Sequence, residues 1–231
     1  SFIKASVVDI EILTDHAITA AMFQLAKKNN IYYILRGNNF ATEHGMPRTW
    51  LWKKYDFQNI KNIHKKYGRL KIKSFPHMNK YKWLFIRKYG LINEFIPLLN
   101  HINYKKFEAV EKLKSDINWQ SYGAKHYESI FTKFYQCYIL PKKFGIDKRK
   151  VHLSALIRND EISRKDAIEE ISKPLYPDAE LQQDKEYVLK KLDFSESEFE
   201  RIMTENPVSH EYYNHSGLLL NAFRSICRNF D

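Results

Sequence analysis

The chain has 231 residues, 44% of them hydrophobic, and a formal net charge of +11. A chain of this length and hydrophobic content can bury a core in one or two domains, which excludes an intrinsically disordered protein. The positive charge favours anionic ligands, among them nucleic acid, an anionic lipid surface, a nucleotide or an acidic sugar, but it does not choose among them and fits a broad lysine bias equally well.

The cysteines and the apolar runs indicate the cellular compartment in which the protein is expected. Cys137 and Cys227 are far apart, and no Cys-x-x-Cys spacing suggests a zinc or redox site. His152 has no partner at a metal-ligand spacing, so no metal site is expected. The apolar run Ile31–Leu35 is too short to span a bilayer, and no cleavable signal pattern is found. We expect a cytoplasmic protein without membrane insertion.

The first third of the chain predicts one α/β unit. Thr14 is a candidate cap for a helix over residues 15–29 that Asn30 closes. The run Ile31–Leu35 is typical of a parallel strand buried on both faces. The polar loop 36–43 then follows at the carboxyl end of the strand, where open parallel sheets place ligands.

The rest of the chain predicts mainly helices. Asp56 can cap a helix that ends at Gly68, and Tyr81–Tyr89 suggests another. Further helices are expected at Tyr104–Ile117, at His126–Leu140 stopped by Pro141, at Lys150–Arg158, at Ser163–Ser172, and near Asp184, Ser195 and Ser209. The fold class predicted is therefore α/β, a parallel-sheet remnant followed by a mainly α-helical lobe.

Two short segments carry candidate nucleotide-binding groups. In the loop after the strand, a glycine permits close backbone approach and polar side chains offer donors and acceptors: Gly37, Asn38, Asn39, Thr42 and Glu43. Asp15 and His16 fall in a first helical turn, where free N–H groups can hold an anion. Ordinary Asx turns and a first-turn acid explain the same residues equally simply.

The densest polar cluster lies further along the chain. At helical spacing, His126, Ser129 and Lys133 share one side and Lys125, Glu128 and Thr132 another, so one helix could present an acid, a base and a cation to a cleft. A solvated amphipathic helix has the same pattern. Lys148 and Arg149 belong to a basic turn that suits a diphosphate, or that merely flanks a helix.

Several of these runs together resemble the N-acetyl sugar amidotransferase family of surface-polysaccharide and nonulosonic acid biosynthesis, a branch of the PP-loop ATP pyrophosphatases. The matching runs are Lys4–Ser6 with Thr14–Ile18, Gly37–Glu43, Gly123–Phe134, Leu140–Arg149 and His152–Ser154. The family's phosphate-binding signature, Ser-Gly-Gly-x-Asp-Ser, is absent from these 231 residues. The resemblance thus implies the C-terminal portion only, with an expected N-terminal half removed or carried separately.

The resemblance implies a division into residues 1–103, part of a PP-loop nucleotide-binding domain, and 104–231, a helical substrate-binding lobe. It also implies an ATP-dependent reaction that converts a sugar N-acetyl group to an acetamidino group through an adenylylated intermediate and ammonia, in O-antigen or related glycan biosynthesis. This fragment alone is expected to be inactive. ATP and Mg²⁺ would be held mainly by the missing part, and a separate glutaminase would supply ammonia. The substrate would be a nucleotide-activated or nonulosonic N-acetyl sugar.

The residue roles that the resemblance implies fall into three groups. Catalysis is assigned to Lys125, His126 and Glu128. Cofactor binding is assigned to Asp15, His16, Gly37, Asn38, Asn39, Thr42 and Glu43. Substrate and phosphate binding is assigned to Ser129, Thr132, Lys133, Lys148 and Arg149.

Two other functions stay open. A PP-loop enzyme that modifies tRNA would suit the positive charge and would bind with a strong salt dependence, although we expect no nucleic-acid partner. The second is a non-catalytic, basic helical interaction module, in which the polar side chains from Lys125 to Lys133 would be solvent-exposed surface residues without a catalytic role.

Overall fold

The computed structural model describes residues 1–79, 94–121 and 127–213. Contacts within the chain divide it into two compact units, each assembled from separate segments: unit 1 from 1–34, 48–95 and 206–231, and unit 2 from 35–47 and 96–205. The division expected from the sequence, into residues 1–103 and residues 104–231, stays a prediction. None of the described helices is long and apolar enough to cross a membrane.

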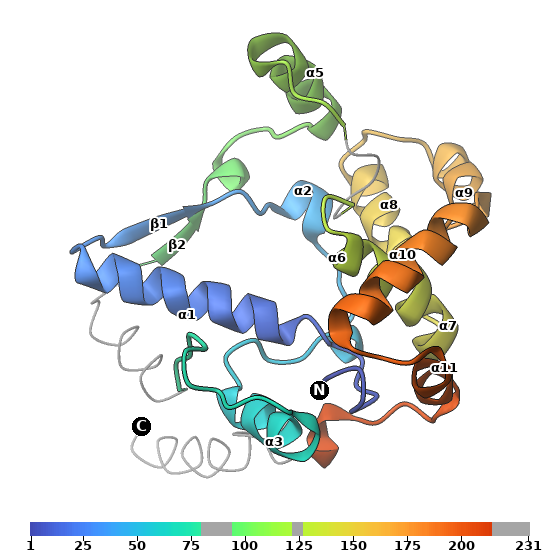
Figure 1. Cartoon of the computed structure of the whole chain (residues 1–231). Coiled ribbons are helices and arrows are strands. Elements are labelled where there is room, and N and C mark those ends of the chain that lie inside the picture. The colour runs from blue at the N-terminus through green and yellow to red at the C-terminus, as the bar shows by residue number, and fades with distance from the viewer. Residues whose placement is uncertain (80–93, 122–126, 214–231) are drawn as a thin grey trace, which may run out of the picture. The chain divides into compact units, whose positions relative to one another are not determined.

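Unit 1 is built around α1 (Ile12–Lys28), shown in Figure 1. The predicted cap was wrong: α1 begins after Glu11, so Thr14 lies inside the helix. The physical reason is burial, because Ile12 is the first member of an inward face that continues through His16, Ala20 and Phe23. Asn30 follows the helix with a positive φ of 54°, as the expected closing residue.

Helix α3 (Phe57–Tyr67) packs on α1 and confirms the capping prediction. Asp56 accepts a hydrogen bond from the backbone N–H of Asn59 at 3.2 Å, and Gly68 follows the last residue. Ile60 and Ile63 of this helix are fully buried.

Residues 206–213 return to the beginning of the chain and complete unit 1. The Val208 N–H donates to the Ser6 carbonyl at 2.9 Å, and the Tyr213 hydroxyl donates to the Ala5 carbonyl at 3.0 Å. The Asn59 side chain donates to the carbonyls of His210 and Tyr213 at 2.8 and 2.9 Å. The last segment therefore bridges α3 and the first residues.

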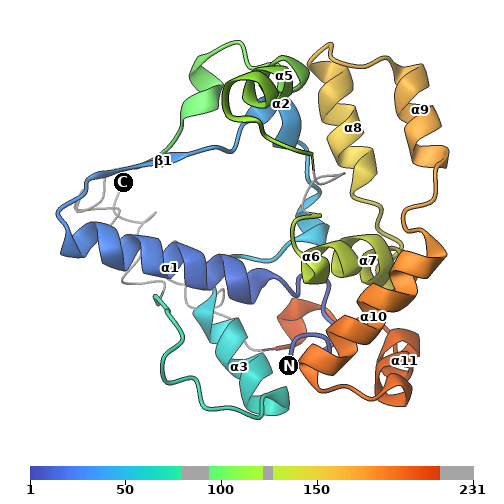
Figure 2. The same ribbon diagram turned by 45° about the horizontal axis from the view of Figure 1, so that its top comes forward.

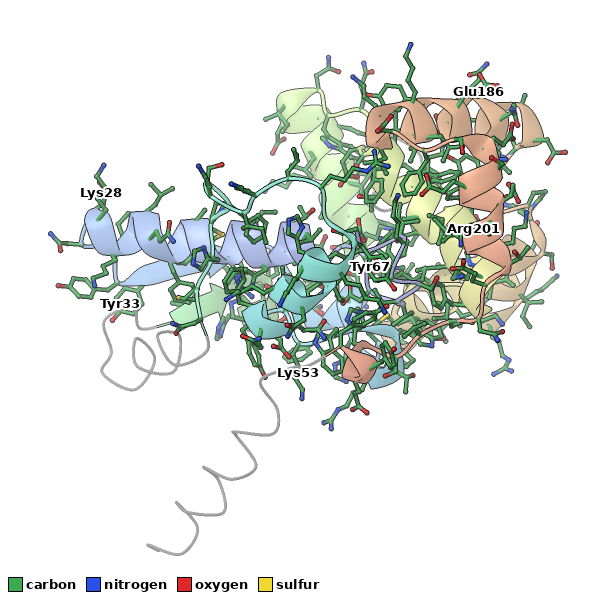
Figure 3. All side chains as sticks on the ribbon, turned by 60° about the horizontal axis from the view of Figure 1, so that its bottom comes forward. Lys28, Tyr33, Lys53, Tyr67, Glu186 and Arg201 are labelled. Atoms are coloured by element: carbon green, nitrogen blue, oxygen red, sulfur yellow. The ribbon has the colours of Figure 1, made fainter. Side chains whose placement is uncertain are left out.

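The strand β1 (Tyr33–Arg36) pairs with β2 (Glu94–Pro97) in a parallel sheet that has two strands among the described residues. The expected buried, central strand was wrong: Ile31 is 49% exposed and Tyr33, labelled in Figure 3, is 60% exposed. Ile34 packs against a cluster of buried side chains, Ala20, Phe23, Ala26 and Met78. The apolar run Ile31–Leu35 is thus covered on one side only. The two strands do not establish the sheet of a PP-loop domain.

Unit 2 is helical. Its α-helices are α2 (Phe40–Glu43), α5 (Lys106–Ile117), α6 (Ile130–Phe134), α7 (Leu140–Phe144), α8 (Arg149–Arg158), α9 (Arg164–Ser172), α10 (Asp178–Leu192) and α11 (Glu196–Thr204). Helix α2 packs on α8, α8 lies beside α9, and α10 packs on α6 (Figures 1 and 2). Glu186 on α10 and Arg201 on α11 point outward in Figure 3.

Side-chain caps begin several of these helices, which lie where they were expected. The Ser163 hydroxyl accepts from the Asp166 N–H at 3.1 Å while the Asp166 carboxylate accepts from the Ser163 N–H, a complete capping box. The Ser195 hydroxyl accepts from the Glu198 N–H at 3.1 Å. Near Ser209 the structure has a 3₁₀ turn, η4 (His210–Tyr212). The further 3₁₀ turns are η1 (Arg48–Trp50) and η2 (Leu98–His101), and the helix expected at Tyr81–Tyr89 lies outside the described residues.

The predicted stop at Pro141 was also wrong. Helix α6 runs into a π-helical segment, η3 (Tyr135–Ile139), and then into α7, which contains Pro141 and ends at Gly145 with a φ of 66°. In a regular α-helix the proline ring would clash with the carbonyl four residues earlier. The wider π-helical turn, in which the Leu140 N–H bonds to the Tyr135 carbonyl, precedes the ring and lets the helix continue.

Candidate functional site

Two adjoining cavities lie within unit 2. The first, here the loop cavity, has a volume of about 520 Å³ between the segment after β1, α5 and α8; its lining includes Gly37, Asn39, Thr42, Glu43, Tyr104, Lys114 and Trp119. The second, the basic-turn cavity, has about 400 Å³ and includes Tyr127, Gln136, Cys137, Asp147, Lys148 and Arg149. Both are also lined by Lys106, Phe107, His152 and Leu156, so they form one cleft.

The segment after β1 supplies four of the five predicted loop residues to the loop cavity. Asn39 caps α2, since its Oδ1 accepts from the Thr42 N–H at 2.8 Å and from the Thr42 hydroxyl at 3.1 Å. A Cβ at Gly37 would meet no protein atom within 4 Å, so the backbone there is open. Asn38 is not among the lining residues. The loop therefore forms a polar wall of the cavity in which Asn39 and Thr42 are already hydrogen-bonded to each other.

The basic turn places Lys148 and Arg149 in the second cavity, but in different ways. The Arg149 guanidinium pairs with Asp147 at 2.9 Å and donates to the carbonyls of Glu170, Ile171 and Lys173 at 3.2, 3.1 and 2.9 Å. It thereby ties the beginning of α8 to the end of α9. The Lys148 ammonium lies 5.6 Å from the centre of the Tyr135 ring.

The predicted polar helix is used for structure where it is described. The Ser129 hydroxyl caps α6 by accepting from the Thr132 N–H at 3.3 Å. Lys133 is buried, lies 4.7 Å from the centre of the Tyr176 ring, and pairs with Glu180 and with Asp184. Burial alone would lower the pKa of Lys133, but hydrogen bonds to both carboxylates outweigh burial and raise it.

None of Ser129, Thr132 and Lys133 is among the described residues that line the cleft. Glu128 is exposed in the turn before α6, whereas Lys125 and His126 lie outside the described residues. The structure therefore joins the loop after β1 to the basic turn and leaves the described part of the polar helix away from the lining of both cavities.

Asp15 and His16 belong to unit 1, where each has protein partners. Asp15 pairs with Lys54 at 2.7 Å. The buried His16 ring contacts the Lys54 carbonyl at 2.7 Å through Nδ1, accepts from the Met78 N–H at 3.3 Å through Nε2, and stacks on Phe57. Burial lowers the pKa of His16, which keeps the ring neutral near pH 7.

Sequence reasoning missed the contribution of α5. Lys106, Val110 and Lys114 follow one another at intervals of four and all line the loop cavity, a spacing that puts side chains on one helical face. This four-residue spacing in the sequence could have indicated that the three side chains face the same cavity. Phe107 and Trp119 add aromatic surface to the same wall.

The thiol of Cys137 also faces the cleft. The π-helical segment carries Gln136 and Cys137 into the basic-turn cavity. The Cys137 Sγ lies 3.2 Å from the Tyr127 hydroxyl, which donates to the Leu175 carbonyl at 3.3 Å. Burial raises the pKa of this thiol, so at neutral pH it is a protonated, weakly nucleophilic group.

A comparison with protein-family models adds one decisive observation. Residues 128–226 match the model described as LPS biosynthesis protein WbpG-like, C-terminal domain. This part of the chain is similar to a WbpG-like C-terminal domain. The match supports the resemblance to the C-terminal portion of an N-acetyl sugar amidotransferase-like family, and its description indicates a role in LPS or related glycan biosynthesis. Searches of curated proteins and of solved structures gave no match.

The matched segment, residues 128–226, contains only part of the cleft. It includes the basic turn, Cys137 and His152, whereas α5 and the segment after β1 precede it in the sequence. Among the described residues, no group of three or more His, Cys, Asp or Glu side chains is placed to hold a metal ion. The Ser-Gly-Gly-x-Asp-Ser run that would bind the phosphates of ATP is absent from the 231 residues.

Proposed function

We propose that this chain is the sugar-binding, C-terminal part of an ATP-dependent amidotransferase that converts a sugar N-acetyl group to an acetamidino group in LPS O-antigen or related glycan biosynthesis. The observation that carries the proposal is the WbpG-like match together with a cleft that joins the basic turn of this domain to the polar loop 37–43. A reaction that uses ATP in this way belongs in the cytoplasm.

The chemistry explains why ATP is required. An amide carbon is a poor electrophile because resonance delocalises the nitrogen lone pair, so its oxygen must first become a leaving group. ATP supplies this when the amide oxygen attacks the α-phosphate and pyrophosphate departs. Ammonia then forms the new C–N bond, and AMP leaves with the former amide oxygen. The products are the acetamidine, AMP and pyrophosphate.

The role of this chain in that scheme is to bind and orient the sugar. The loop cavity offers neutral polar groups from Asn39 and Thr42, and the basic-turn cavity offers Lys148 to an acidic group. Lys125, His126 and Glu128 are proposed to handle protons at the reacting amide. The Arg149 guanidinium donates hydrogen bonds to both carboxylate oxygens of Asp147 and to three backbone carbonyls of unit 2. We therefore propose that Arg149 positions the basic turn.

ATP, Mg²⁺ and ammonia are proposed to come from outside these residues. The phosphate-binding signature is absent here, so another part of the enzyme would hold the nucleotide and its metal ion. A glutaminase of the thiol type needs an activated thiolate, and the pKa of buried Cys137 is raised instead. A separate glutaminase would therefore feed ammonia to the site.

The test uses the full-length enzyme with ATP, Mg²⁺, ammonium and candidate nucleotide-activated or nonulosonic N-acetyl sugars. We expect AMP and pyrophosphate to appear only when a suitable sugar is present, with an acetamidino product visible by mass spectrometry. Glu128→Gln should lower turnover while sparing sugar affinity. Sugar-independent AMP formation, or tight tRNA binding whose logarithm falls linearly with log salt, would favour a tRNA-modifying enzyme.

A further inference from the structure

We infer that unit 2 contains a second ligand site, here called the outer cavity, which takes a small molecule that carries an oxyanion, a carboxylate or a phosphate monoester, on an apolar ring. The outer cavity has a volume of about 450 Å³ and is lined by α2, by residues 99–104 and by the end of α8. Among the described residues it shares Tyr104 with the loop cavity and no residue with the basic-turn cavity. The inference therefore goes beyond the proposed function and does not rest on it.

The outer cavity differs from the cleft in the charges of its lining. Each part of the cleft has as many lysine and arginine as aspartate and glutamate side chains, two of each kind in the loop cavity and three of each in the basic-turn cavity. The described lining of the outer cavity includes Arg158 and no carboxylate. A lining of this kind favours an anion over a neutral ligand or a cation.

Two backbone carbonyls and a glycine hold the Arg158 guanidinium in place. Its Nε donates to the Ser154 carbonyl at 3.3 Å, and its Nη2 donates to the His44 carbonyl at 3.0 Å. Gly45 has a φ of 99°, and a Cβ there would lie 3.2 Å from the same Nη2. Carbonyls carry no net charge, and Nη1 makes no hydrogen bond to a described residue, so the positive charge and one side of the planar fork are left for a ligand.

The acid that follows Arg158 most closely inside the hydrogen-bond network of unit 2 is engaged elsewhere. Glu161 accepts from the Asn159 side chain at 2.7 Å and from the Phe107 N–H at 3.0 Å. Asn159 also donates to the Tyr104 carbonyl at 3.1 Å, which ties residues 99–104 to the end of α8. The walls of the outer cavity are thus joined before a ligand arrives, which reduces the entropy lost on binding.

Two asparagine amides add uncharged donors to the lining. The Asn100 Oδ1 accepts from the Phe40 N–H at 2.8 Å, so the amino group of Asn100 is left as a donor. Asn103 is exposed, and its side chain makes no hydrogen bond within the described ranges. Together with Arg158, these amides can donate to several oxygens of one anion.

The same cavity has an apolar side. Phe40 is 64% exposed and Ile102 is 62% exposed, although both line a concave surface. The His44 ring lies edge-on to Phe40, with the ring centres 5.3 Å apart. Contact with an apolar ring would remove these surfaces from water, and the volume lies within the range of small-molecule sites.

The test measures binding to the complete 231-residue chain by saturation-transfer NMR titration. Phenyl phosphate and benzoate carry a ring and an oxyanion, benzyl alcohol carries the ring alone, and inorganic phosphate carries the anion alone. We expect each ring oxyanion to bind at least roughly tenfold more tightly than benzyl alcohol and than inorganic phosphate. The tighter of the two ring oxyanions identifies the site as one for phosphate monoesters or for carboxylates.

Three variants test the role of the guanidinium. Arg158→Gln should weaken binding of both ring oxyanions roughly tenfold to a hundredfold, because a charged hydrogen bond is lost. Lys150→Gln is the matched control, since Lys150 is exposed on the same helix and lines none of the three cavities, and it should change the affinity less than about twofold. Gly45→Ala removes no donor but displaces the guanidinium, so it should also weaken binding. Circular dichroism checks that each variant is folded.

The result that would overturn the inference is equal affinity of Arg158→Gln and wild type for both ring oxyanions. Binding of benzyl alcohol as tight as that of benzoate, or no saturable binding of either ring oxyanion, would overturn it as well. Alkylation of Cys137, which lines the basic-turn cavity, locates the probe: an unchanged rate supports the outer cavity, and a slower rate would place the probe in the cleft. Formation of an acetamidino sugar by the full-length enzyme tests the proposed function separately, which stands even if this inference fails.

Discussion

The Lys133 ammonium lies 3.2 Å from a carboxylate oxygen of Asp184 inside unit 2, and α6 is joined to α10 by this pair. Only 6% of the residue surface of Lys133 is exposed. Removal of one partner from a buried ion pair leaves the other charge uncompensated, which costs about 3 to 5 kcal/mol. We therefore expect Lys133→Met to lower the free energy of unfolding by about 3 kcal/mol in urea denaturation.

Lys142→Met is the matched control for that measurement. The Lys142 ammonium is half-exposed and lies 3.9 Å from Glu200, so the expected loss is below about 1 kcal/mol. Similar losses in both variants would contradict a structural role for Lys133 and return it to the list of candidate ligand-binding residues.

His210 makes unit 1 sensitive to acid. The ring is buried between the Asp9 N–H, 3.3 Å from Nε2, and the side-chain oxygen Oδ1 of Asn59, 2.9 Å from Nδ1, which suits a neutral imidazole that accepts at one nitrogen and donates at the other. Burial lowers the pKa of His210 to about 4. As the pH falls from about 6.5 to about 4, the unfolded chain takes up a proton that the folded chain resists, so stability decreases in that window.

The expected contribution of this histidine is about 3 kcal/mol between those pH values, at about 1.4 kcal/mol per pH unit. The measurement is the free energy of unfolding of wild type and of His210→Gln at pH 7 and pH 4.5. We expect the variant to lose less stability on acidification than wild type. The exposed His101→Gln serves as control, and an unchanged pH dependence in His210→Gln would show that other groups set the acid sensitivity.

A variant of Arg149 distinguishes the phosphate-binding role expected from the sequence from the structural role that its hydrogen bonds indicate. The conservative variant Arg149→Lys keeps the charge but loses the planar fork that reaches Asp147 and three carbonyls, so we expect about 2 kcal/mol of lost stability. Affinity for UDP-N-acetylglucosamine should then change little at a temperature where the variant is folded. A large loss of affinity without a loss of stability would instead support the phosphate contact that the sequence suggests.

Cys137 reports on occupancy of the basic-turn cavity. In a Cys227→Ser background it is the remaining cysteine, and its raised pKa and burial predict slow reaction with iodoacetamide at pH 7. UDP-N-acetylglucosamine should slow the reaction further, because the thiol lines the cavity. The rate is followed by mass spectrometry, with Cys137→Ser confirming the site of labelling; equal rates with and without a saturating ligand would place the ligand elsewhere.

The sequence predicted best what depends on neighbouring residues. The cap at Asp56 and the helices expected from Ser163 and near Ser195 were correct because, at each, a short side chain and a backbone N–H three residues later form a local hydrogen bond. The end of α3 at Gly68 has the same local origin. Helix positions in the last two thirds of the chain were therefore largely foreseeable.

What failed depended on distant residues. The burial of Ile31–Leu35 depends on what packs against the strand, which periodicity does not report. The carboxylates that pair with Lys133 stand 47 and 51 residues away, and the carbonyls that Arg149 holds lie on another helix, so spacing along the chain did not report these contacts; the ligand roles of both residues stay predictions. The cleft itself results from α2 packing on α8, a contact between segments more than a hundred residues apart.

The interleaving of the two units has a consequence for synthesis on the ribosome. Unit 1 begins with the first residue but needs residues 206–213, which bond to Ala5, Ser6 and Asn59. The last residue that unit 2 needs is 205. Since domains tend to fold as units while the chain emerges, we expect the cleft-bearing unit to close first, with α1 and α3 waiting until residues 206–213 have been synthesised. We thus expect the unit that begins first on the ribosome to be the second to fold.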